Sequence, residues 1–314
     1  MDDNLEVIPA SQTGAPVFDI MVPTHNRIDL TMKCLQSIYF HTSTPFHLIV
    51  VDDSTDNLTV PYFYELLAKG VAPLGKVANL TFIHSKVPYR EGNQFFNIAL
   101  SHCKSEYMAI AMNSVRVEPE WEKFALETLM PNNPNVGAIG FKCLFGGDNN
   151  NVGRIESAGI KMIKYVPTDI GRDFPGHRLT GVMEPDAIQW AFCMVRVKAA
   201  RGNLEEGVFH GFMGWDDISN SFSLKEKGWR ILYCGLGVGY HEPRSTRGSN
   251  TTDAERKNKE NGERFYKRHG FWDLFLKEES LRKVDVHDMP SEIRTAQEVG
   301  MRTEFQPNRE EVPV

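Results

Sequence analysis

Two adjacent carboxylates, Asp216 and Asp217, follow Trp215 and come directly before residues 218–227, whose apolar side chains have helical spacing. A carboxylate near an apolar wall can have the raised basicity that a general base requires. An Asp before a helix is also a common N-terminal cap. The pair is therefore a candidate for proton abstraction, with a purely structural cap as the alternative.

Polar side chains also follow three short apolar segments that read as buried strands, at residues 18–22, 47–51 and 107–112. In an open α/β sheet, ligands bind where parallel strands end. We therefore predict that these turns and the Asp pair share one edge of a sheet. The residues in the three turns are Pro23, Thr24, His25, Arg27, Asp52, Asp53, Asn113 and Ser114.

Strands alternate with helices through the first ~115 residues, which predicts a parallel, doubly wound sheet. The later part is more mixed and contains both strand-like and helical patterns. In the first part we expect strands at 18–22, 47–51, 80–84 and 107–112, and helices at 28–41, 62–69 and 91–103. In the second part we expect strands at 136–141, 188–197 and 229–233, and helices at 218–227 and 251–269.

Charge and cysteine content narrow the class of protein. The 314 residues include 35 Lys and Arg against 41 Asp and Glu, a net charge of −6, which argues against coating nucleic acid or anionic membrane by bulk charge. The 5 cysteines are far apart and lie in or beside apolar runs, so we expect buried thiols in a reducing compartment. No apolar run reaches the ~18 residues of a membrane span and the N-terminus lacks a signal pattern, which predicts a cytoplasmic protein.

The ends of the chain differ from its middle. Residues 1–15 are interpreted as a loose leader, and residues 278–314 form a polar tail that could mediate oligomer contacts. One domain is expected between them, at residues 16–277, with a first half to residue 115 and a second half from residue 116.

The order of the short motifs resembles the inverting family 2 glycosyltransferases of the GT-A fold. The resemblance covers roughly residues 17–270 and implies an α/β fold, with a Rossmann-like nucleotide-binding half fused to a mixed-sheet acceptor half. It also implies sugar transfer from a nucleotide diphosphate sugar, with a UDP-sugar as the expected donor, to a hydroxyl acceptor on a glycan or on a modified base in DNA. The motifs are PTHNR at 23–27, VDDSTD at 51–56, Gly92 to Asn97, VRVEPEW at 115–121, Trp-Asp-Asp at 215–217 and Tyr-His at 240–241.

The resemblance also implies roles for individual residues. Asp217 would be the base, and Asp216 would bind acceptor hydroxyls or orient the site. Asp52 or Asp53 would accept a hydrogen bond from the nucleobase, because a uracil-type imide offers an N–H donor. Pro23, Thr24, His25, Arg27 and Asn97 would complete the nucleotide site. Trp190 and Trp215 would border the acceptor, although a Trp on an apolar strand more often packs in a core.

One position departs from the family pattern. Relatives usually carry Asp-x-Asp after the fourth strand, where the last acid holds Mn²⁺ or Mg²⁺, whereas this chain has Ser114 there. Neutral oxygens are weaker ligands for a hard cation. Asn113 or Ser114 could hold the metal with His241 and water, or Arg116 or Arg244 could replace it. The third alternative is a nucleotide-sugar-binding protein that no longer transfers.

Overall fold

A computed structural model of the chain describes residues 4–9, 15–69, 75–87, 91–147, 150–210, 214–243 and 251–274. Residues 278–314, the expected tail, lie outside the described residues. The strands are β1 (Leu5–Pro9), β2 (Phe18–Thr24), β3 (Phe46–Asp52), β4 (Val77–Ser85), β5 (Tyr107–Ala111), β6 (Val115–Val117), β7 (Val136–Phe145), β8 (Ile155–Ser157), β9 (Ile160–Ile163), β10 (Val166–Asp169), β11 (Val182–Met183), β12 (Phe192–Arg196) and β13 (Arg230–His241). The helices are α1 (Ile28–His41), α2 (Thr59–Lys69), α3 (Gly92–His102), the π-helical turn η1 (Ala125–Leu129), α4 (Met130–Asn132), α5 (Val197–Ala200), α6 (Asp216–Glu226) and α7 (Thr251–Arg268).

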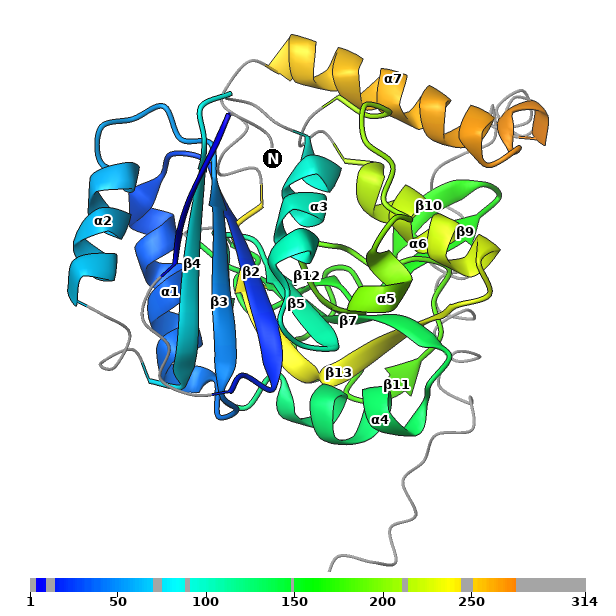
Figure 1. Ribbon diagram of the computed structural model, residues 1–314. Coiled ribbons are helices and arrows are strands. Elements are labelled where there is room, and N and C mark those ends of the chain that lie inside the picture. The colour runs from blue at the N-terminus through cyan, green and yellow to red at the C-terminus, as the bar shows by residue number, and fades with distance from the viewer. Residues whose placement is uncertain are drawn as a thin grey trace, which may run out of the picture.

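One mixed sheet runs through both halves of the domain, in the order β1-β4-β3-β2-β5-β12-β7-β13-β11 (Figure 1). The strands β4, β3, β2 and β5 are parallel, as the alternation of strands and helices predicts. Beyond them β12 is antiparallel to both β5 and β7, whereas β13 is parallel to β7. The carboxyl ends of β2, β3, β5, β7 and β13 therefore lie along one edge.

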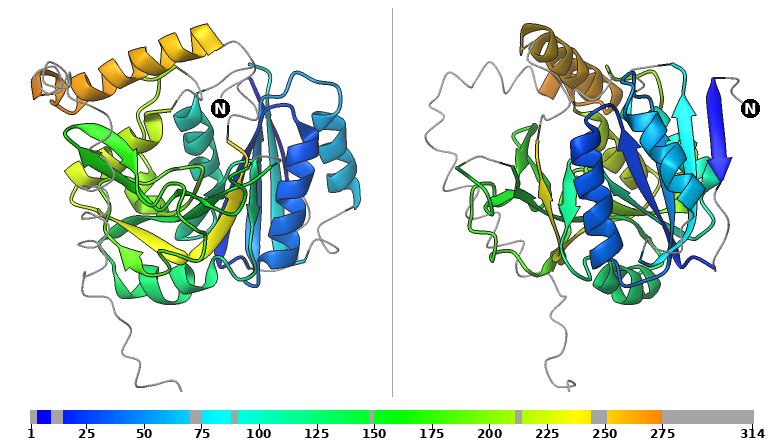
Figure 2. Two further views of the ribbon diagram at one scale, coloured as in Figure 1. Left: turned by 180° about the vertical axis from the view of Figure 1, so that it is seen from behind. Right: turned by 90° about the vertical axis from the view of Figure 1, so that its left-hand side faces the viewer.

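Helices cover both faces of the sheet, which explains why β2 and β3 are apolar along most of their length. On one face, α1, α2 and η1 pack on alternate strand residues such as Phe18, Ile20 and Leu48. On the other face, α3 and α6 pack on Met21, Ile49 and their neighbours. Helix α7 lies across the end of the molecule at which the parallel strands finish (Figures 1 and 2).

Strand β2 continues through Pro23 to Thr24, two residues beyond the expected end of the strand. Pro has no N–H for a ladder bond, so it is normally excluded from central strands. Here β2 pairs with β5 only as far as Met21, so the ladder on that side has already ended before Pro23. The strand thereby carries Thr24 to the edge of the sheet.

The expectation of a loose leader is wrong for part of residues 1–15. Leu5–Pro9 pair antiparallel with β4, with Leu5 opposite Ser85 and Pro9 opposite Thr81. The segment is short and ends in Pro, so its local pattern is weak. Its pairing to the otherwise open edge of β4 decides its conformation.

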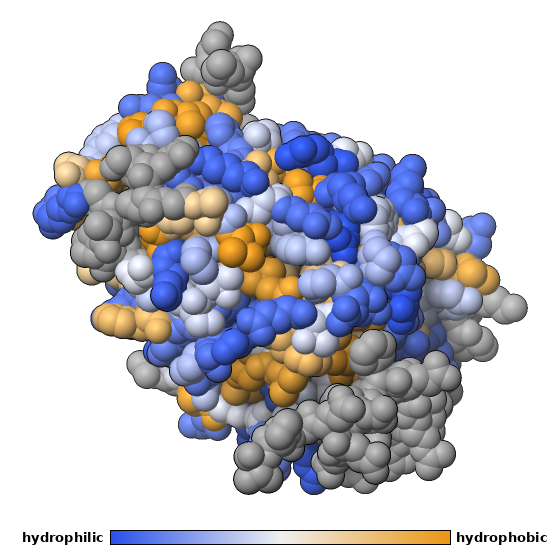
Figure 3. Space-filling model, turned by 60° about the horizontal axis from the view of Figure 1, so that its bottom comes forward, coloured by the Kyte–Doolittle hydropathy of each residue, from blue (hydrophilic) through white to orange (hydrophobic). Residues whose placement is uncertain are grey.

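The second half differs from expectation in its boundaries. The expected strand at 188–197 starts only at Phe192, and the expected strand at 229–233 extends to His241 with an irregularity between Cys234 and Val238. The end of the molecule opposite α7 shows hydrophobic side chains in separate patches among hydrophilic ones (Figure 3). No helix in the described part of the chain has the length and apolar character needed to span a bilayer.

Candidate active site

The ends of three adjacent parallel strands meet at one level of the sheet. Thr24 on β2 is in register with Asp52 on β3, and Asp52 is in register with His84 on β4. This alignment brings two of the expected site residues together and adds a third, His84, which the sequence analysis did not single out.

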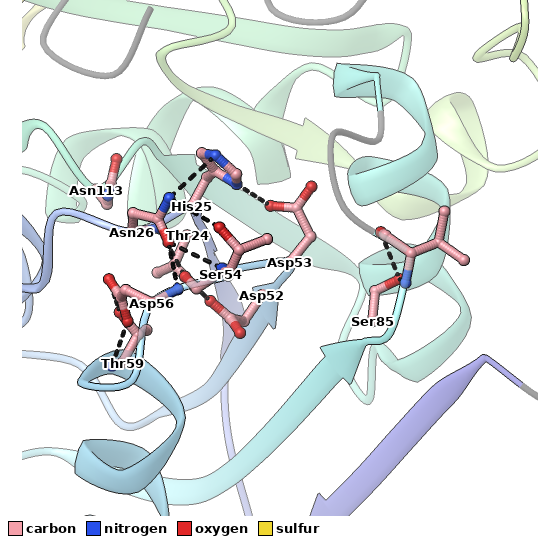
Figure 4. A network of polar contacts seen from close by, with 12 residues as sticks. Thr24, His25, Asn26, Asp52, Asp53, Ser54, Asp56, Thr59, Ser85 and Asn113 are labelled. Carbon is pink, nitrogen blue, oxygen red and sulfur yellow. Dashed lines mark hydrogen bonds and ion pairs between the residues drawn. The ribbon is translucent and has the colours of Figure 1, made fainter. Parts of the chain in front are cut away.

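The buried carboxylate of Asp52 joins these strand ends. Thr24 donates its hydroxyl proton to Asp52 Oδ1 at 2.7 Å, and Ser54 donates to the same oxygen at 2.5 Å (Figure 4). His84 Nδ1 lies 2.7 Å from Asp52 Oδ2. Because both oxygens are bound by protein groups, Asp52 anchors the ends of these strands, and its contact with a nucleobase stays a prediction.

The adjacent carboxylate, Asp53, supports His25. His25 Nδ1 lies 2.7 Å from Asp53 Oδ1, and the Asp53 side chain is fully buried whereas that of His25 is partly exposed (Figure 4). The hydrogen bond to Asp53 raises the pKa of His25 above its ordinary value, and burial opposes this shift. His25 thus presents an oriented ring at the surface of the site, and Asp53 holds it there.

The turn between β2 and α1 has an unusual backbone. Asn26 and Arg27 both have positive φ values, 53° and 51°. Asn26 is held there because its side-chain oxygen accepts hydrogen bonds from the backbone N–H groups of Thr55 and Asp56, both at 2.9 Å. Positive φ in residues other than glycine is costly and persists where surrounding contacts impose it. The turn therefore ties the loop after β2 to the loop after β3.

Ser114 and His241 lie side by side although they are far apart in the sequence. Strand β6 pairs with β13 so that Val115 is opposite His241, and the backbone N–H of Glu242 donates to the carbonyl oxygen of Ser114 at 3.0 Å. His241 Nδ1 lies 2.8 Å from Oε2 of the buried Glu156 on β8. The segments that carry Ser114 and His241 are thus neighbours, and Glu156 is a further partner that sequence patterns did not indicate.

Two arginines approach the same region. Arg116 Nη2 lies 3.7 Å from Glu242 Oε1. The charge of Glu242 also contributes to raising the pKa of Arg27, after the larger effect of the hydrogen bond to Asp29. Arg116 on β6 and Arg27, which precedes α1, are therefore both near enough to Glu242 to interact with its charge, and guanidinium groups suit an anion such as a diphosphate.

The donor groups do not fit a divalent cation held by carboxylates. Ser114 is neutral, and the Asn113 side-chain amide donates to Thr31 Oγ1 at 3.1 Å. Within the described part of the chain, no group of three or more His, Cys, Asp or Glu side chains is arranged to hold a metal ion. Hard cations prefer charged oxygen ligands, and Asn113 and Ser114 offer only neutral ones.

The two acids of the Trp-Asp-Asp motif occupy different surroundings. The Asp216 carboxylate lies against Gly92, the first residue of α3, where a side chain would collide with Asp216 Oδ2. The partial positive charge of a helix N-terminus stabilises a carboxylate. The charge of Asp216 also contributes to raising the pKa of Glu91, after burial, which is the larger cause. Asp216 is therefore packed on the start of α3.

The Asp217 carboxylate lies at the start of α6, where its Oδ1 accepts a hydrogen bond from the backbone N–H of Ile218 at 2.8 Å. Its charge contributes, after burial, to raising the pKa of the Cys193 thiol on β12. Cys193 is in register with Ile110 on β5, the strand that leads to Asn113 and Ser114. The Asp217 side chain is half-buried, so it combines partial desolvation with access, as a general base requires.

Three other expected site residues lie elsewhere. Trp190 is 1% exposed and packs against Phe96 in the core, so its expected role at an acceptor is wrong. Asn97 lies more than one turn into α3, and its side-chain amide donates hydrogen bonds to the carbonyl oxygen of Leu204 and to Glu206 Oε1. Arg244 lies outside the described residues.

The comparison with solved structures bears on the fold. No protein-family model matches the sequence, and no curated protein matches it. Among solved structures, GalNAc-T7 with UDP, GalNAc and Mn²⁺ matches at a TM-score of 0.61 and 12% identity, over 91% of this chain and 55% of that one. The mannosyltransferase PcManGT from Pyrobaculum calidifontis, in complex with GDP-Man and Mn²⁺, matches at a TM-score of 0.50 and 15% identity. The match covers 94% of this chain and 84% of that one.

This chain has the GT-A fold. At such low identity the likeness shows the fold alone, and the chain spans about half the length of the GalNAc-T7 chain, 55%. The expected α/β class and GT-A architecture are confirmed.

The His25–Asp53 pair should give a pH-dependent contribution to stability. Because the folded-state pKa of His25 is raised, the pair stabilises the fold fully below the unfolded value of about 6.5, and the effect is lost as pH rises through the folded value. Asp53→Asn should lower the His25 pKa measured by NMR titration and should destabilise the fold more at about pH 5.5 than at about pH 9. His102, whose pKa is lowered by burial, is the internal control and should not move. An unchanged His25 titration would contradict the assignment.

Trp190 should behave as a core residue. Trp190→Ala should lower the free energy of unfolding by about 3–5 kcal/mol in urea denaturation, because it leaves a cavity beside Phe96. Trp190→Phe retains a ring and should cost much less. A Trp190→Ala protein that is as stable as the unmodified protein but binds the acceptor more weakly would contradict the assignment of Trp190 to the core.

Proposed function

We propose that this protein transfers a sugar from a nucleotide diphosphate sugar to a hydroxyl acceptor, with inversion at the anomeric carbon. The observation that carries the proposal is the half-buried Asp217 in the first turn of α6, within a GT-A fold that also carries His25 and Arg27 after β2 and Arg116 on β6. Two solved structures that share this fold hold UDP and GDP-Man, respectively. Family 2 membership and a cytoplasmic location are part of the proposal and rest on the sequence pattern.

The reaction is a single in-line displacement. Asp217 takes the proton from the acceptor hydroxyl while its oxygen attacks the anomeric carbon. The new carbon–oxygen bond forms as the bond to the diphosphate breaks, and the nucleoside diphosphate leaves with the negative charge. Arg27 and Arg116 stabilise that charge, because guanidinium pairs well with phosphate oxygens. Asp216, held on α3, keeps the first turn of α6 in place.

The nucleotide occupies the edge formed by the ends of β2 and β3. His25 offers its ring to the base, and Asp53 fixes the orientation of that ring. A UDP-sugar is the donor we propose. The acceptor is a hydroxyl group on a glycan or on a modified base in DNA.

A second candidate function is nucleotide-sugar binding without transfer. The observation that favours it is the neutral pair Asn113 and Ser114, which replaces the acidic metal ligand of the family pattern. The two functions share the donor site and differ in turnover.

A thermal-shift screen tests donor binding. Nucleotide diphosphate sugars should raise the melting temperature because they bind only the folded state, and free sugars should not. The shift should persist in EDTA, since arginine and histidine provide the charge at the site. UDP-sugars should give larger shifts than GDP-sugars. If no nucleotide sugar shifts the transition, with or without Mn²⁺, both candidate functions fail.

Asp217→Asn tests the chemical step. Removal of a general base should reduce kcat about 10²–10⁴-fold. The donor-induced thermal shift should be unchanged, because the proposed nucleotide site lies at the ends of β2 and β3 whereas Asp217 lies on α6. Glu127→Gln, at an exposed position on the opposite face of the sheet, is the matched control and should retain full turnover. Turnover in Asp217→Asn within about twofold of the unmodified protein would exclude Asp217 as the base.

A further inference from the structure

Helix α7 contacts the segment that leads into the two acids. The buried Asn261 side chain accepts a hydrogen bond from the backbone N–H of His210 at 2.7 Å and donates to the carbonyl oxygen of the same residue at 3.0 Å. It also donates to the carbonyl oxygen of Gly214 at 3.2 Å. One side chain of α7 thus fixes the backbone on both sides of residues 211–213, immediately before Trp215.

Trp215 is held by the same helix. Its ring lies 5.4 Å from the ring of Phe265 and 5.4 Å from that of Tyr266, measured between centroids. The ring also covers Gly262, where an added Cβ would lie 3.0 Å from Trp215 Cζ2. Gly262 therefore leaves room for the indole to approach the helix backbone closely.

The backbone of Trp215 requires such support. Its φ of 77° and ψ of −26° lie in the left-handed region, which side chains other than glycine rarely adopt. Trp215 is also the N-cap of α6, and its carbonyl accepts the hydrogen bond from the N–H of Ser219 at 2.9 Å. The direction in which α6 starts, and hence the position of Asp216 and Asp217, follows from this conformation.

The residue that follows the C-terminal end of α7 also contacts α6. His269, just after the helix, has Nε2 at 2.8 Å from the Ser219 hydroxyl and Nδ1 at 2.7 Å from Glu226 Oε1. Contacts with α7 therefore extend from the N-cap of α6 to its last turn.

We propose that Asn261 and Gly262 are positioning residues for the catalytic carboxylate, because they hold Trp215 in the conformation from which α6 presents Asp217. This inference rests on the proposed function of Asp217. It assigns to α7 a role in the chemical step and none in donor binding, because the described contacts of α7 do not include the ends of β2 and β3.

Two variants test the inference, one by removing a hydrogen-bond donor and the other by adding a methyl group. Asn261→Asp has the same shape but places a second oxygen, in place of the donor nitrogen, against the carbonyls of His210 and Gly214. Gly262→Ala adds a methyl group that pushes the indole, while alanine favours the helix more than glycine does. The exposed Lys259 on the same helix provides the control variant, Lys259→Gln.

For each variant, kcat, the KM for the donor, the melting temperature and the donor-induced thermal shift are measured. We expect kcat to fall at least about tenfold in both Asn261→Asp and Gly262→Ala, with donor KM and thermal shift within about twofold of the unmodified protein. Gly262→Ala should lose activity without losing melting temperature, which a role in stability alone would not produce. Lys259→Gln should match the unmodified protein.

Two results would overturn the inference. One is full kcat in Gly262→Ala, or in Asn261→Asp if it folds. The other is a parallel loss of kcat and donor affinity. If Asn261→Asp does not fold, Gly262→Ala decides alone. The proposed function fails separately, when the unmodified protein neither binds a nucleotide sugar nor transfers one.

Discussion

The buried carboxylate of Asp52 organises the edge on which the rest of the site depends. A buried charge is stable only when its oxygens are hydrogen-bonded, and here Thr24, Ser54 and His84 supply those bonds from three segments. The strand ends are therefore locked at one level. This frees the neighbouring carboxylate, Asp53, to orient His25 toward the surface of the site.

Much of this edge could be predicted from the sequence. Apolar runs ended by polar turns located β2, β3 and β5, and the rule that ligands bind at strand ends grouped Thr24, His25, Asp52 and Asp53 correctly. The same rule applied to the strand at 80–84 would have found His84. The individual roles could not be predicted, because Asp52 and Asp53 are adjacent residues of the same type. Only their partners in the fold show that Asp52 joins the strand ends and that Asp53 orients His25.

Other features depend on contacts between distant segments, which no local pattern reveals. Glu156 reaches His241 only because β8 is paired with β7, and β7 lies beside β13. Trp190 was expected to border an acceptor, yet packing against Phe96 places it in the core. In the same way, Arg116 on β6 lies near Glu242, which follows β13, only because β6 pairs with β13.

The packing of Asp216 on Gly92 has a consequence for how the sequence can change over time. The first turns of α3 and α6 are far apart along the chain, but they share one small volume that the carboxylate already fills. A residue larger than glycine at position 92 would collide with the Asp216 carboxylate unless position 216 carried a shorter side chain. Among homologous chains these two positions should therefore covary, and an ancestor with a side chain at the first position would have carried a different residue at the start of the acidic pair.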